Sequence, residues 1–505
     1  AEDCSADWRI EALMQLGHCL ARLRLHAQAA DCYRTVTALQ PQAVDAAINA
    51  AHHSAWACTW PELQDDLARL QTSLAGLDQP EAAPAGREPS PFGLLSFSDD
   101  PALLRRIAEL ACRPLRPAEP PPAPPLQRHD GRLRLGLLSS DFHHHATAML
   151  LVQALEAIDP SRFELHFYSG GPDDGSALQQ RIRACARRVR PIHQLSDAEV
   201  AAQIRADGIA ILFDLKGHTH GARLGILAQR PAPLQVAWLG YPGSSGADFI
   251  DYIIGDPVVT PLAAQADYSE RIAQLPHCYQ PNDSERPQPA PLDRAACGLP
   301  EQALVLASFN QSYKMGPELF GAWCHILAEL PGSLLWLLVP EAETQARLRT
   351  AASACGIDPA RLVFAPFLPT EQHRARLPCA DLILDTYPCS GHTTSSDALW
   401  AGVPVLTLCG HSFGARVAAS LLATLGLPEL ICNDIEQYAA QAIALGRQPA
   451  ELQALRQRLA EARQTTPTFD GRRFAADLQA LLLRMVERAD AGLPPAPLPA
   501  AGATA

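Results

Sequence analysis

The sequence has almost no lysine. Of its 41 basic side chains only Lys216 and Lys314 are lysines, and the others are arginines. We expect these two to have been kept where a compact ammonium is needed, because Arg and Lys differ in size, hydration and donor geometry. Chance survival is the competing interpretation. Both residues are predicted to lie in loops directly after strands.

Other absences exclude whole classes of protein. The chain has no run of about 18 apolar residues, so we expect no transmembrane span. A net charge of -13 argues against nucleic acid as the main partner. The 14 cysteines include no CxxC pair and no zinc-ligand spacing, which suits small buried hydrophobic residues in a reducing cytoplasm. The first residues, AEDCSADWRI, show no secretory leader, and the missing initiator methionine indicates a fragment or a processed form.

The N-terminal part has the periodicity of helices. Leu16, Tyr33 and Pro41 fall near the spacing of a tetratricopeptide repeat. One repeat cannot bury its own apolar face, so we expect missing upstream repeats or docking on a neighbouring part of the chain. Residues 1–112 are therefore predicted to form a helical region of the tetratricopeptide type.

From Arg132 onward short apolar runs alternate with amphipathic stretches, as in a parallel sheet with crossover helices. The alternation stops at a proline-rich connector, 281–292, and then restarts. We predict two successive doubly wound, Rossmann-like α/β domains with a cleft between them and sites at the carboxyl ends of their strands. The predicted boundaries are 113–130 for a proline-rich linker, 131–290 for the first lobe, 291–440 for the second, 441–490 for C-terminal helices and 491–505 for a disordered tail.

The most informative stretch is 381–408, DLILDTYPCSGHTTSSDALWAGVPVLTL, which predicts strand, loop, helix and strand in succession. In this arrangement the free backbone N–H groups of the helix start bind phosphate. Asp397 would repel a phosphate, so ribose hydroxyls suit it better. The alternative is a capping box, with Thr394 as the cap and Asp397 three residues further on. The spacing leaves both interpretations open.

Two loops after strands of the first predicted lobe also carry candidate side chains. His143, His144 and His145 follow a strand in SSDFHHHATAML, where a general base, a solvated surface and core packing are competing roles. His218 lies in DLKGHTHGAR. The Gly-rich turn WLGYPGSSG comes next, and its glycines let the backbone approach a ligand closely.

No D-x-D triplet occurs in the chain, so the usual carboxylate-bound metal is not expected. A departing nucleoside diphosphate would have to be stabilised in another way. Lys314, in FNQSYKMGP, and the helix start at 392–394 offer an ammonium and oriented N–H donors for that charge.

Four motifs together resemble the protein O-GlcNAc transferases and their SPINDLY-type relatives: SSDFHHHATAML, WLGYPGSSGADFIDYIIGD, FNQSYKMGP and GHTTSSDALWAGVPVLTL. The resemblance covers residues 10–485. It implies tetratricopeptide repeats joined to a two-lobed GT-B glycosyltransferase. The implied reaction is inverting, metal-independent transfer of N-acetylglucosamine from UDP-GlcNAc to Ser and Thr hydroxyls of proteins, with no cofactor. Protein O-fucosyl transfer from GDP-fucose and a silent nucleotide-binding scaffold stay open as alternatives.

The resemblance also implies roles for single residues. Lys314 corresponds to the lysine that contacts the diphosphate, Asp397 to the ribose carboxylate and His145 to the histidine considered as the base. Ala146 stands where the family has proline, and Thr370 stands where animal members have lysine. The other predicted substrate-binding residues are His218, Tyr241, Pro242, Gly243, Gln311, Leu368, Pro369, His373, Arg376, His392, Thr393 and Thr394.

The expected partners are a UDP-sugar donor and protein or peptide acceptors, without nucleic acid or membrane. The expected location is cytoplasmic. A homodimer through the helical region is one arrangement that the sequence leaves open.

Overall fold

The computed structural model describes residues 2–76, 90–119 and 121–502, without the side chains of 2–6 and 76. Residues 77–89, which the sequence predicts to be part of a loop, lie outside these ranges. The chain forms two compact units, each assembled from distant segments. The first unit comprises Ala1–Asp99, Pro287–His411 and Pro428–Glu461; the second comprises Asp100–Arg286, Ser412–Leu427 and Ala462–Ala505. Among the helices of the described ranges, none is long and apolar enough to cross a membrane.

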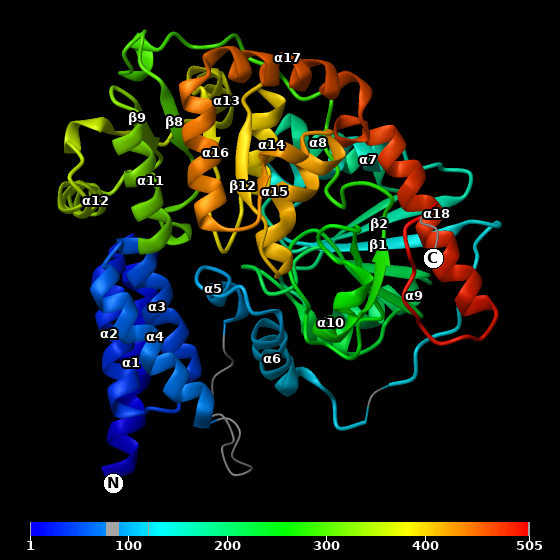
Figure 1. The fold of residues 1–505 in the computed structure, drawn as a ribbon. Helices are drawn as coiled ribbons and strands as arrows, with labels where there is room; N and C mark the ends of the chain where they lie inside the picture. The colour runs from blue at the N-terminus through cyan, green and yellow to red at the C-terminus, as the bar shows by residue number, and fades with distance from the viewer. Residues whose placement is uncertain (1, 77–89, 120, 503–505) are drawn as a thin grey trace. The chain divides into compact units, whose positions relative to one another are not determined.

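The first unit begins with an all-α region, as predicted. Its helices are α1 (Glu2–Arg22), α2 (His26–Leu39), α3 (Val44–Ala57), α4 (Trp60–Gly76) and the short α5 (Pro91–Leu94), and α1 to α4 pack in succession (Figure 1). Tyr33 is completely buried in the core of this region. It lies so close to Gly17 that a Cβ there would stand 2.7 Å from the tyrosine ring. This contact explains why a residue without a side chain stands at position 17.

The rest of the first unit is a parallel α/β sheet. Its strand order is β10-β9-β8-β11-β12-β13. The strands are β8 (Val305–Ser308), β9 (Leu334–Leu337), β10 (Leu362–Phe364), β11 (Leu382–Leu384), β12 (Val405–Leu408) and β13 (Ile431–Cys432). The connecting helices are η4 (Ser312–Lys314), α11 (Pro317–Glu329), α12 (Ala342–Ala354), α13 (Thr370–Arg376), α14 (Thr393–Trp400) and α16 (Ile435–Arg447).

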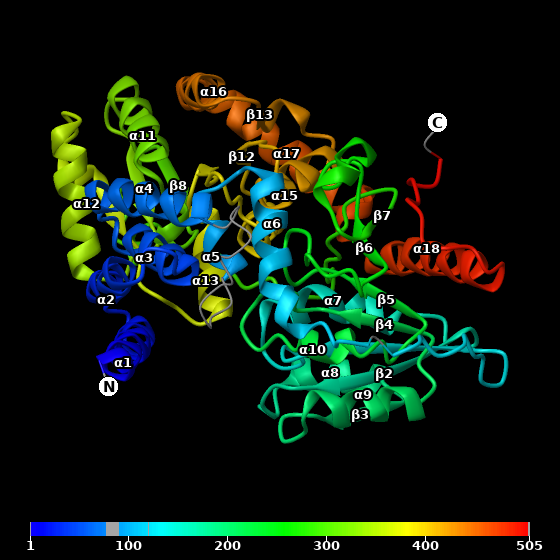
Figure 2. The same cartoon turned by 90° about the horizontal axis from the view of Figure 1, so that it is seen from below.

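The second unit has a seven-stranded parallel sheet of order β3-β2-β1-β4-β5-β6-β7 (Figure 2). Its strands are β1 (Leu133–Ser139), β2 (Phe163–Ser169), β3 (Arg188–Pro191), β4 (Ile211–Asp214), β5 (Leu234–Ala237), β6 (Tyr252–Gly255) and β7 (Arg271–Gln274). Its helices include α6 (Pro101–Cys112), α7 (Ala146–Glu156), α8 (Ala177–Cys185), α9 (Asp197–Ala206), α10 (Leu224–Ala228), α15 (Phe413–Thr424) and α18 (Gly471–Asp490). Helix α17 (Pro449–Thr465) passes from the first unit into the second.

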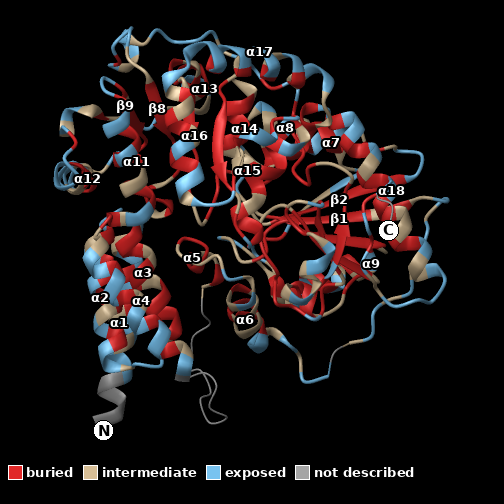
Figure 3. Cartoon of the chain, viewed as in Figure 1, coloured by how far each residue is buried: buried red, intermediate tan, exposed pale blue. Residues whose placement is uncertain are grey.

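Both predicted Rossmann-like sheets are confirmed, and most of their strands are buried along their whole length (Figure 3). Each sheet also reverses its strand order once. The reversal lies between β8 and β11 in the first unit and between β1 and β4 in the second. Ligands of open α/β sheets bind at the carboxyl ends of the strands at such a reversal. The loops at 309–314 and 385–394, and those at 140–145 and 215–218, occupy these places.

The prediction of a disordered tail is wrong for the described part, 491–502. Leu498 forms a parallel bridge with Ala273 of β7, and its N–H and C=O groups bond Ile272 and Gln274, each at 2.9 Å. The side chain of Leu498 is buried. Strand β7 is the edge of its sheet, so its backbone groups need partners. The tail supplies them despite its proline-rich composition.

Candidate active site

Lys314 lies at the strand reversal of the six-stranded sheet, at the end of η4. Its side chain is buried, and Nζ donates to the carbonyl oxygen of Ser390 at 2.8 Å. Burial lowers the pKa of Lys314, but the neighbouring Cys389, Tyr313 and Asp385 outweigh that effect and raise the pKa, so the ammonium stays charged. An ammonium has three N–H donors, and the Ser390 carbonyl takes one. The site therefore presents a fixed positive charge to an anion.

Asp385 organises the loop after β11 around this lysine. Its carboxylate accepts from the Thr407 hydroxyl at 2.7 Å, the Gly391 N–H at 2.6 Å and the Asn310 amide at 3.0 Å. Asn310 in turn accepts from the Thr394 hydroxyl at 2.6 Å. Burial raises the pKa of Asp385, while the hydrogen bonds from Thr407 and Gly391 oppose the rise. The carboxylate thus ties the ends of three neighbouring strands to one loop.

Helix α14 starts at Thr393, with His392 as the preceding residue. The capping-box interpretation is wrong, because Thr394 is already inside the helix and its hydroxyl donates to Asn310. His392, Thr393 and Thr394 are half-buried, so the helix start is accessible. Backbone N–H groups of a first helical turn have no partner within the helix. This end of α14 can therefore bind a phosphate group.

Asp397 forms an ion pair with Arg374, with 3.3 Å between the carboxylate and the guanidinium. Each side chain is only 9% exposed. Both line a cavity of about 340 Å³ together with Trp400 and the connector 287–291. A carboxylate that is fixed beside a cavity can accept hydrogen bonds from ribose hydroxyls. The arginine partner was not predicted.

His373 lies on α13, and Arg376 lies beneath it. The guanidinium donates to His373 Nδ1 at 2.7 Å and to the Pro366 carbonyl at 2.6 Å, and it stacks over Phe309 at 5.1 Å. Arg376 is only 1% exposed, so it can affect a nucleotide only through the residues that it holds, such as His373 and Pro366. Burial lowers the pKa of His373 to about 4, which leaves a neutral ring that accepts at Nδ1 and donates at Nε2.

The remaining predicted residues of this sheet lie next to those above. Leu368, Pro369 and Thr370 lead into α13, and the carbonyl of Pro369 accepts from the His373 N–H at 2.8 Å. Gln311 precedes η4 and is half-buried. Its carbonyl accepts from the Lys314 N–H at 3.0 Å.

In the second unit, Lys216 and Asp141 form a buried ion pair at the strand reversal. Nζ donates to both carboxylate oxygens, at 2.8 and 2.7 Å. The Thr147 hydroxyl donates to the same carboxylate at 3.3 Å. Asp214, at the end of β4, accepts from the Lys216 N–H at 3.1 Å. Burial raises the pKa of Asp214 to about 6.

His145 caps the start of α7, where its Nδ1 accepts from the Thr147 N–H at 3.2 Å. Burial lowers its pKa, although Asp141 opposes that effect. A neutral imidazole that accepts at Nδ1 carries its proton on Nε2, so Nε2 donates. A role as general base would require His145 to give up this cap. His143 is half-buried and His144 is exposed, with the His144 N–H bonded to Asp174 at 2.7 Å.

His218 is held by the Gly-rich turn. Its Nε2 lies 2.7 Å from the Ser245 carbonyl and must donate to it, so Nδ1 keeps the lone pair. Burial lowers the pKa of His218 to about 4. The ring of Tyr241 stands edge-on to that of His218, with 5.1 Å between centroids. Tyr241, Pro242 and Gly243 are buried, so they form the wall behind the histidine.

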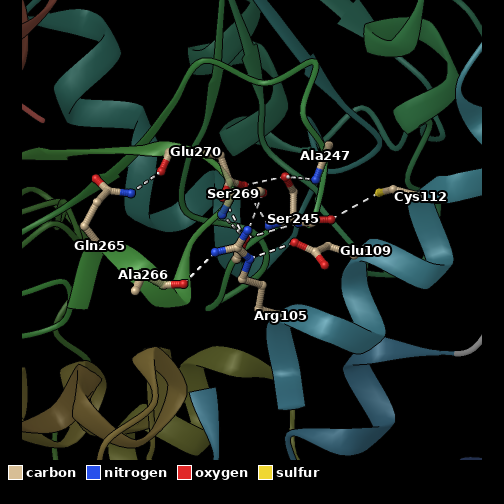
Figure 4. A network of polar contacts seen from close by, with 11 residues as sticks. Arg105, Glu109, Cys112, Ser245, Ala247, Gln265, Ala266, Ser269 and Glu270 are labelled. Carbon is tan, nitrogen blue, oxygen red and sulfur yellow. Dashed lines mark hydrogen bonds and ion pairs between the residues drawn. The ribbon is translucent and has the colours of Figure 1, made fainter. Parts of the chain in front are cut away.

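Glu270 fixes this turn through hydrogen bonds, as Figure 4 shows. The completely buried carboxylate accepts from the Ser244 hydroxyl and the Ser245 N–H, both at 2.7 Å, and from the Ser269 hydroxyl at 3.0 Å. The Cys112 thiol of α6 donates to the Ser245 carbonyl at 3.1 Å. The position of the His218 ring therefore depends on a carboxylate that does not touch it.

Sequence reasoning missed Asp141, Arg374, Asp385, Asn310 and Glu270. Asp385 directly follows β11, and Asp141 and Asn310 each stand two residues after a strand, so their place at strand ends was a usable signal. Arg374 and Glu270 gave no such signal. Within the described ranges, no three His, Cys, Asp or Glu side chains are placed to hold a metal ion.

Comparisons with known proteins point to one family. Residues 121–290 and 283–478 match the model of glycosyl transferase family 41. The chain is 36% identical over 446 residues to the probable UDP-N-acetylglucosamine–peptide N-acetylglucosaminyltransferase SEC of Arabidopsis thaliana, covering 85% of this chain and 45% of that protein. It is 29% identical over 476 residues to the UDP-N-acetylglucosamine–peptide N-acetylglucosaminyltransferase of Caenorhabditis elegans, covering 72% of this chain and 41% of that protein.

A solved structure of a Thermobaculum terrenum O-GlcNAc transferase mutant superposes with a TM-score of 0.81 at 31% identity. The match covers 96% of this chain and 92% of that one. The chain spans less than half the length of the two curated relatives. The family model, the relatives and the shared fold together show that the chain belongs to glycosyltransferase family 41.

Proposed function

We propose that the protein transfers N-acetylglucosamine from UDP-GlcNAc to Ser and Thr hydroxyls of proteins. The observation that carries the proposal is the arrangement around Lys314. A buried ammonium follows β8, and the start of α14 and Asp397 of the same helix follow the neighbouring strand β11. A nucleoside diphosphate needs these three features: a cation, oriented N–H donors and an acceptor for ribose. The printed names of the relatives supply the sugar and the acceptor class.

In the proposed reaction the acceptor hydroxyl attacks the anomeric carbon while the bond to UDP breaks. The hydroxyl proton becomes acidic as the new C–O bond forms and passes late to a weak base on the acceptor side. One displacement inverts the configuration at that carbon. The negative charge that develops on the diphosphate is stabilised by Lys314 and the N–H groups of α14. These protein groups take the place of a metal, and the chain contains no D-x-D triplet for one. The reaction is therefore proposed to be metal-independent and to need no cofactor.

The nucleoside part is assigned to the residues around α13 and α14. Asp397 accepts from the ribose, and His373 donates from Nε2 toward the base. The backbone of Leu368–Thr370 passes beside the base, and Gln311 lies beside the phosphates. Lys216 plays no part in this set, because Asp141 neutralises it.

The histidines of the second unit have different hydrogen-bonding states. His218 is neutral with a lone pair on Nδ1, so it can accept a hydrogen bond from the acceptor hydroxyl, and its low pKa makes it a weak base. His145 presents a protonated Nε2, which suits donation to a sugar or peptide oxygen. We assign acceptor-side contacts to both residues. Leaving-group stabilisation at Lys314 contributes more to the rate than either of them.

The test is calorimetric titration of UDP and of GDP into the protein with EDTA present, followed by a peptide transfer assay in the same buffer. We expect UDP to bind, GDP to be silent, and GlcNAc to reach peptide Ser or Thr as the β-anomer by NMR. Preference for GDP would move the proposal to fucosyl transfer. Binding of UDP without transfer to any peptide or protein lysate would leave a nucleotide-binding scaffold.

A further inference from the structure

The turn that carries Lys314 rests on the N-terminal helices of its unit. Ser312, two residues before the lysine, is buried and donates its hydroxyl to the Trp56 carbonyl of α3 at 2.7 Å. The ring of Tyr313 lies 4.8 Å from that of Trp56 and 5.0 Å from that of His52. The residues that precede Lys314 therefore contact α3 through both a hydrogen bond and ring packing.

The end of α3 is built for this contact. The last carbonyls of a helix have no partner within it and must be satisfied from outside. Here the Trp56 carbonyl accepts from Ser312, and the Ala57 carbonyl accepts from the Arg347 guanidinium of α12 at 3.1 Å. Both partners come from the α/β part of the unit. The helix end is thus matched to that part rather than resting on it by apolar contact alone.

Trp56 is itself held on two sides. Its indole N–H donates to His52 Nε2 at 3.0 Å, and His52 Nδ1 meets the Ser96 hydroxyl at 2.8 Å. On its other face it stacks on His26, with 4.6 Å between centroids and 12° between planes. Burial lowers the pKa values of His26 and His52 to about 4, so both rings are neutral at pH 7. The indole therefore has little freedom to move.

We propose that Trp56, acting through Ser312 and Tyr313, is a positioning residue that sets where Lys314 meets the diphosphate of the donor. The N-terminal helical region is then a working part of the donor site, besides any role in acceptor binding. This inference rests on the proposed function, since it assumes that UDP binds at Lys314. Trp56 itself touches no substrate.

Comparing UDP with uridine isolates this effect, because only UDP carries the phosphates that Lys314 contacts. We expect Trp56→Leu to weaken UDP binding about tenfold. A misplaced Lys314 would lose part of its charge-assisted hydrogen bond to the diphosphate, and a loss of that size corresponds to about a tenfold change in affinity. Uridine binding should stay within about twofold, because His373, Asp397 and Leu368 are untouched. Ser312→Ala, which keeps every ring, should weaken UDP binding by a smaller factor in the same direction.

The matched control is Trp60→Leu. Trp60 is also half-buried in the helical region, but its ring contacts Phe320 of α11 at 5.1 Å and makes no ring contact with Tyr313. For Trp60→Leu we expect a loss of thermal stability with an unchanged UDP-to-uridine affinity ratio.

The inference is overturned if Trp56→Leu and Ser312→Ala both keep the wild-type ratio. If Trp56→Leu fails to fold, the UDP-to-uridine affinity ratio of Ser312→Ala alone tests the inference. A wild-type protein that does not prefer UDP over uridine would instead contradict the proposed function.

Discussion

Each of the two lysines of the chain lies at the strand reversal of its own sheet, yet their surroundings differ. Lys216 follows β4 and donates to both oxygens of Asp141. Lys314 follows β8 and donates to the neutral Ser390 carbonyl, and no carboxylate of the described residues forms an ion pair with it. Asp385 is close by but already accepts from Thr407, Gly391 and Asn310. A buried lysine is available to an anion only where neighbouring carboxylates are otherwise engaged.

The largest effect that tests this comparison is expected for Lys314→Met. Loss of the ammonium should raise the activation barrier by about 3–4 kcal/mol, the size of a lost oxyanion donor. Thermal stability should hardly change, because the methionine removes a charge that no carboxylate balances. Steady-state kcat/KM with a peptide acceptor measures the first and thermal melting the second. His145→Ala should cost less activity, and near-normal turnover of a folded Lys314→Met enzyme would contradict the comparison.

Lys216→Met should show the reverse pattern, with a loss of folding stability of about 3 kcal/mol. It leaves the Asp141 carboxylate buried without its partner. The free energy of unfolding in urea is the measurement. The double variant Lys216→Met with Asp141→Leu removes both charges and should recover most of the loss. A double variant as unstable as the single one would show that the pair is not what Lys216 contributes.

Two buried carboxylates sharpen the comparison further, because each holds a loop in a different unit. Asp385→Asn places an amide against three donors and should weaken UDP binding by about 2 kcal/mol. Glu270→Gln perturbs the turn behind His218 by similar chemistry but should leave UDP affinity unchanged. Calorimetry with UDP on both variants measures the difference. Equal losses would mean that neither carboxylate acts locally.

The smallest effect concerns pH. The folded pKa of Asp214 is raised to about 6 from an ordinary 3.8, so the folded state binds more protons than the unfolded state between these values. Stability should therefore fall as pH rises from 4 to 6 and then level off. Replacement by Asn should remove this component, which we expect to be about 1 kcal/mol between pH 5 and 7. Urea unfolding at both pH values, compared between wild type and Asp214→Asn, gives the answer. An identical pH dependence would contradict the assignment.

The parts of the site that follow a strand were predictable, and the contacts across the chain were not. Strand periodicity placed Lys314 and the start of α14 correctly at the carboxyl edge of a sheet. Strand periodicity does not predict which of Arg374 and Arg376 faces the candidate site, because residues two apart on a helix point to nearly opposite sides. The structure turns Arg374 toward Asp397 and buries Arg376 under His373. Only the packing of α13 against the sheet decides that orientation.

The capping box and the disordered tail failed for a related reason. Thr394 has the right spacing for a cap, but Asn310, 84 positions earlier, takes its hydroxyl. Leu498 lies in a low-complexity stretch, but the unpaired edge of β7 accepts its backbone. Local patterns describe what a segment prefers by itself. A partner from a distant part of the chain decides between preferences of similar strength.

The interleaving of the two units has a consequence for how the protein is made. The helices before residue 100 leave the ribosome well before the remainder of their unit, which comes only with residues 287–461. The unit that starts at residue 100 likewise needs segments from 412 onward. Neither unit can be completed while the chain is half synthesised. The apolar faces of α3 and α4 stay without their later partners while nearly 200 further residues are synthesised. Chaperones that shield exposed apolar surface during translation should therefore raise the yield of this protein.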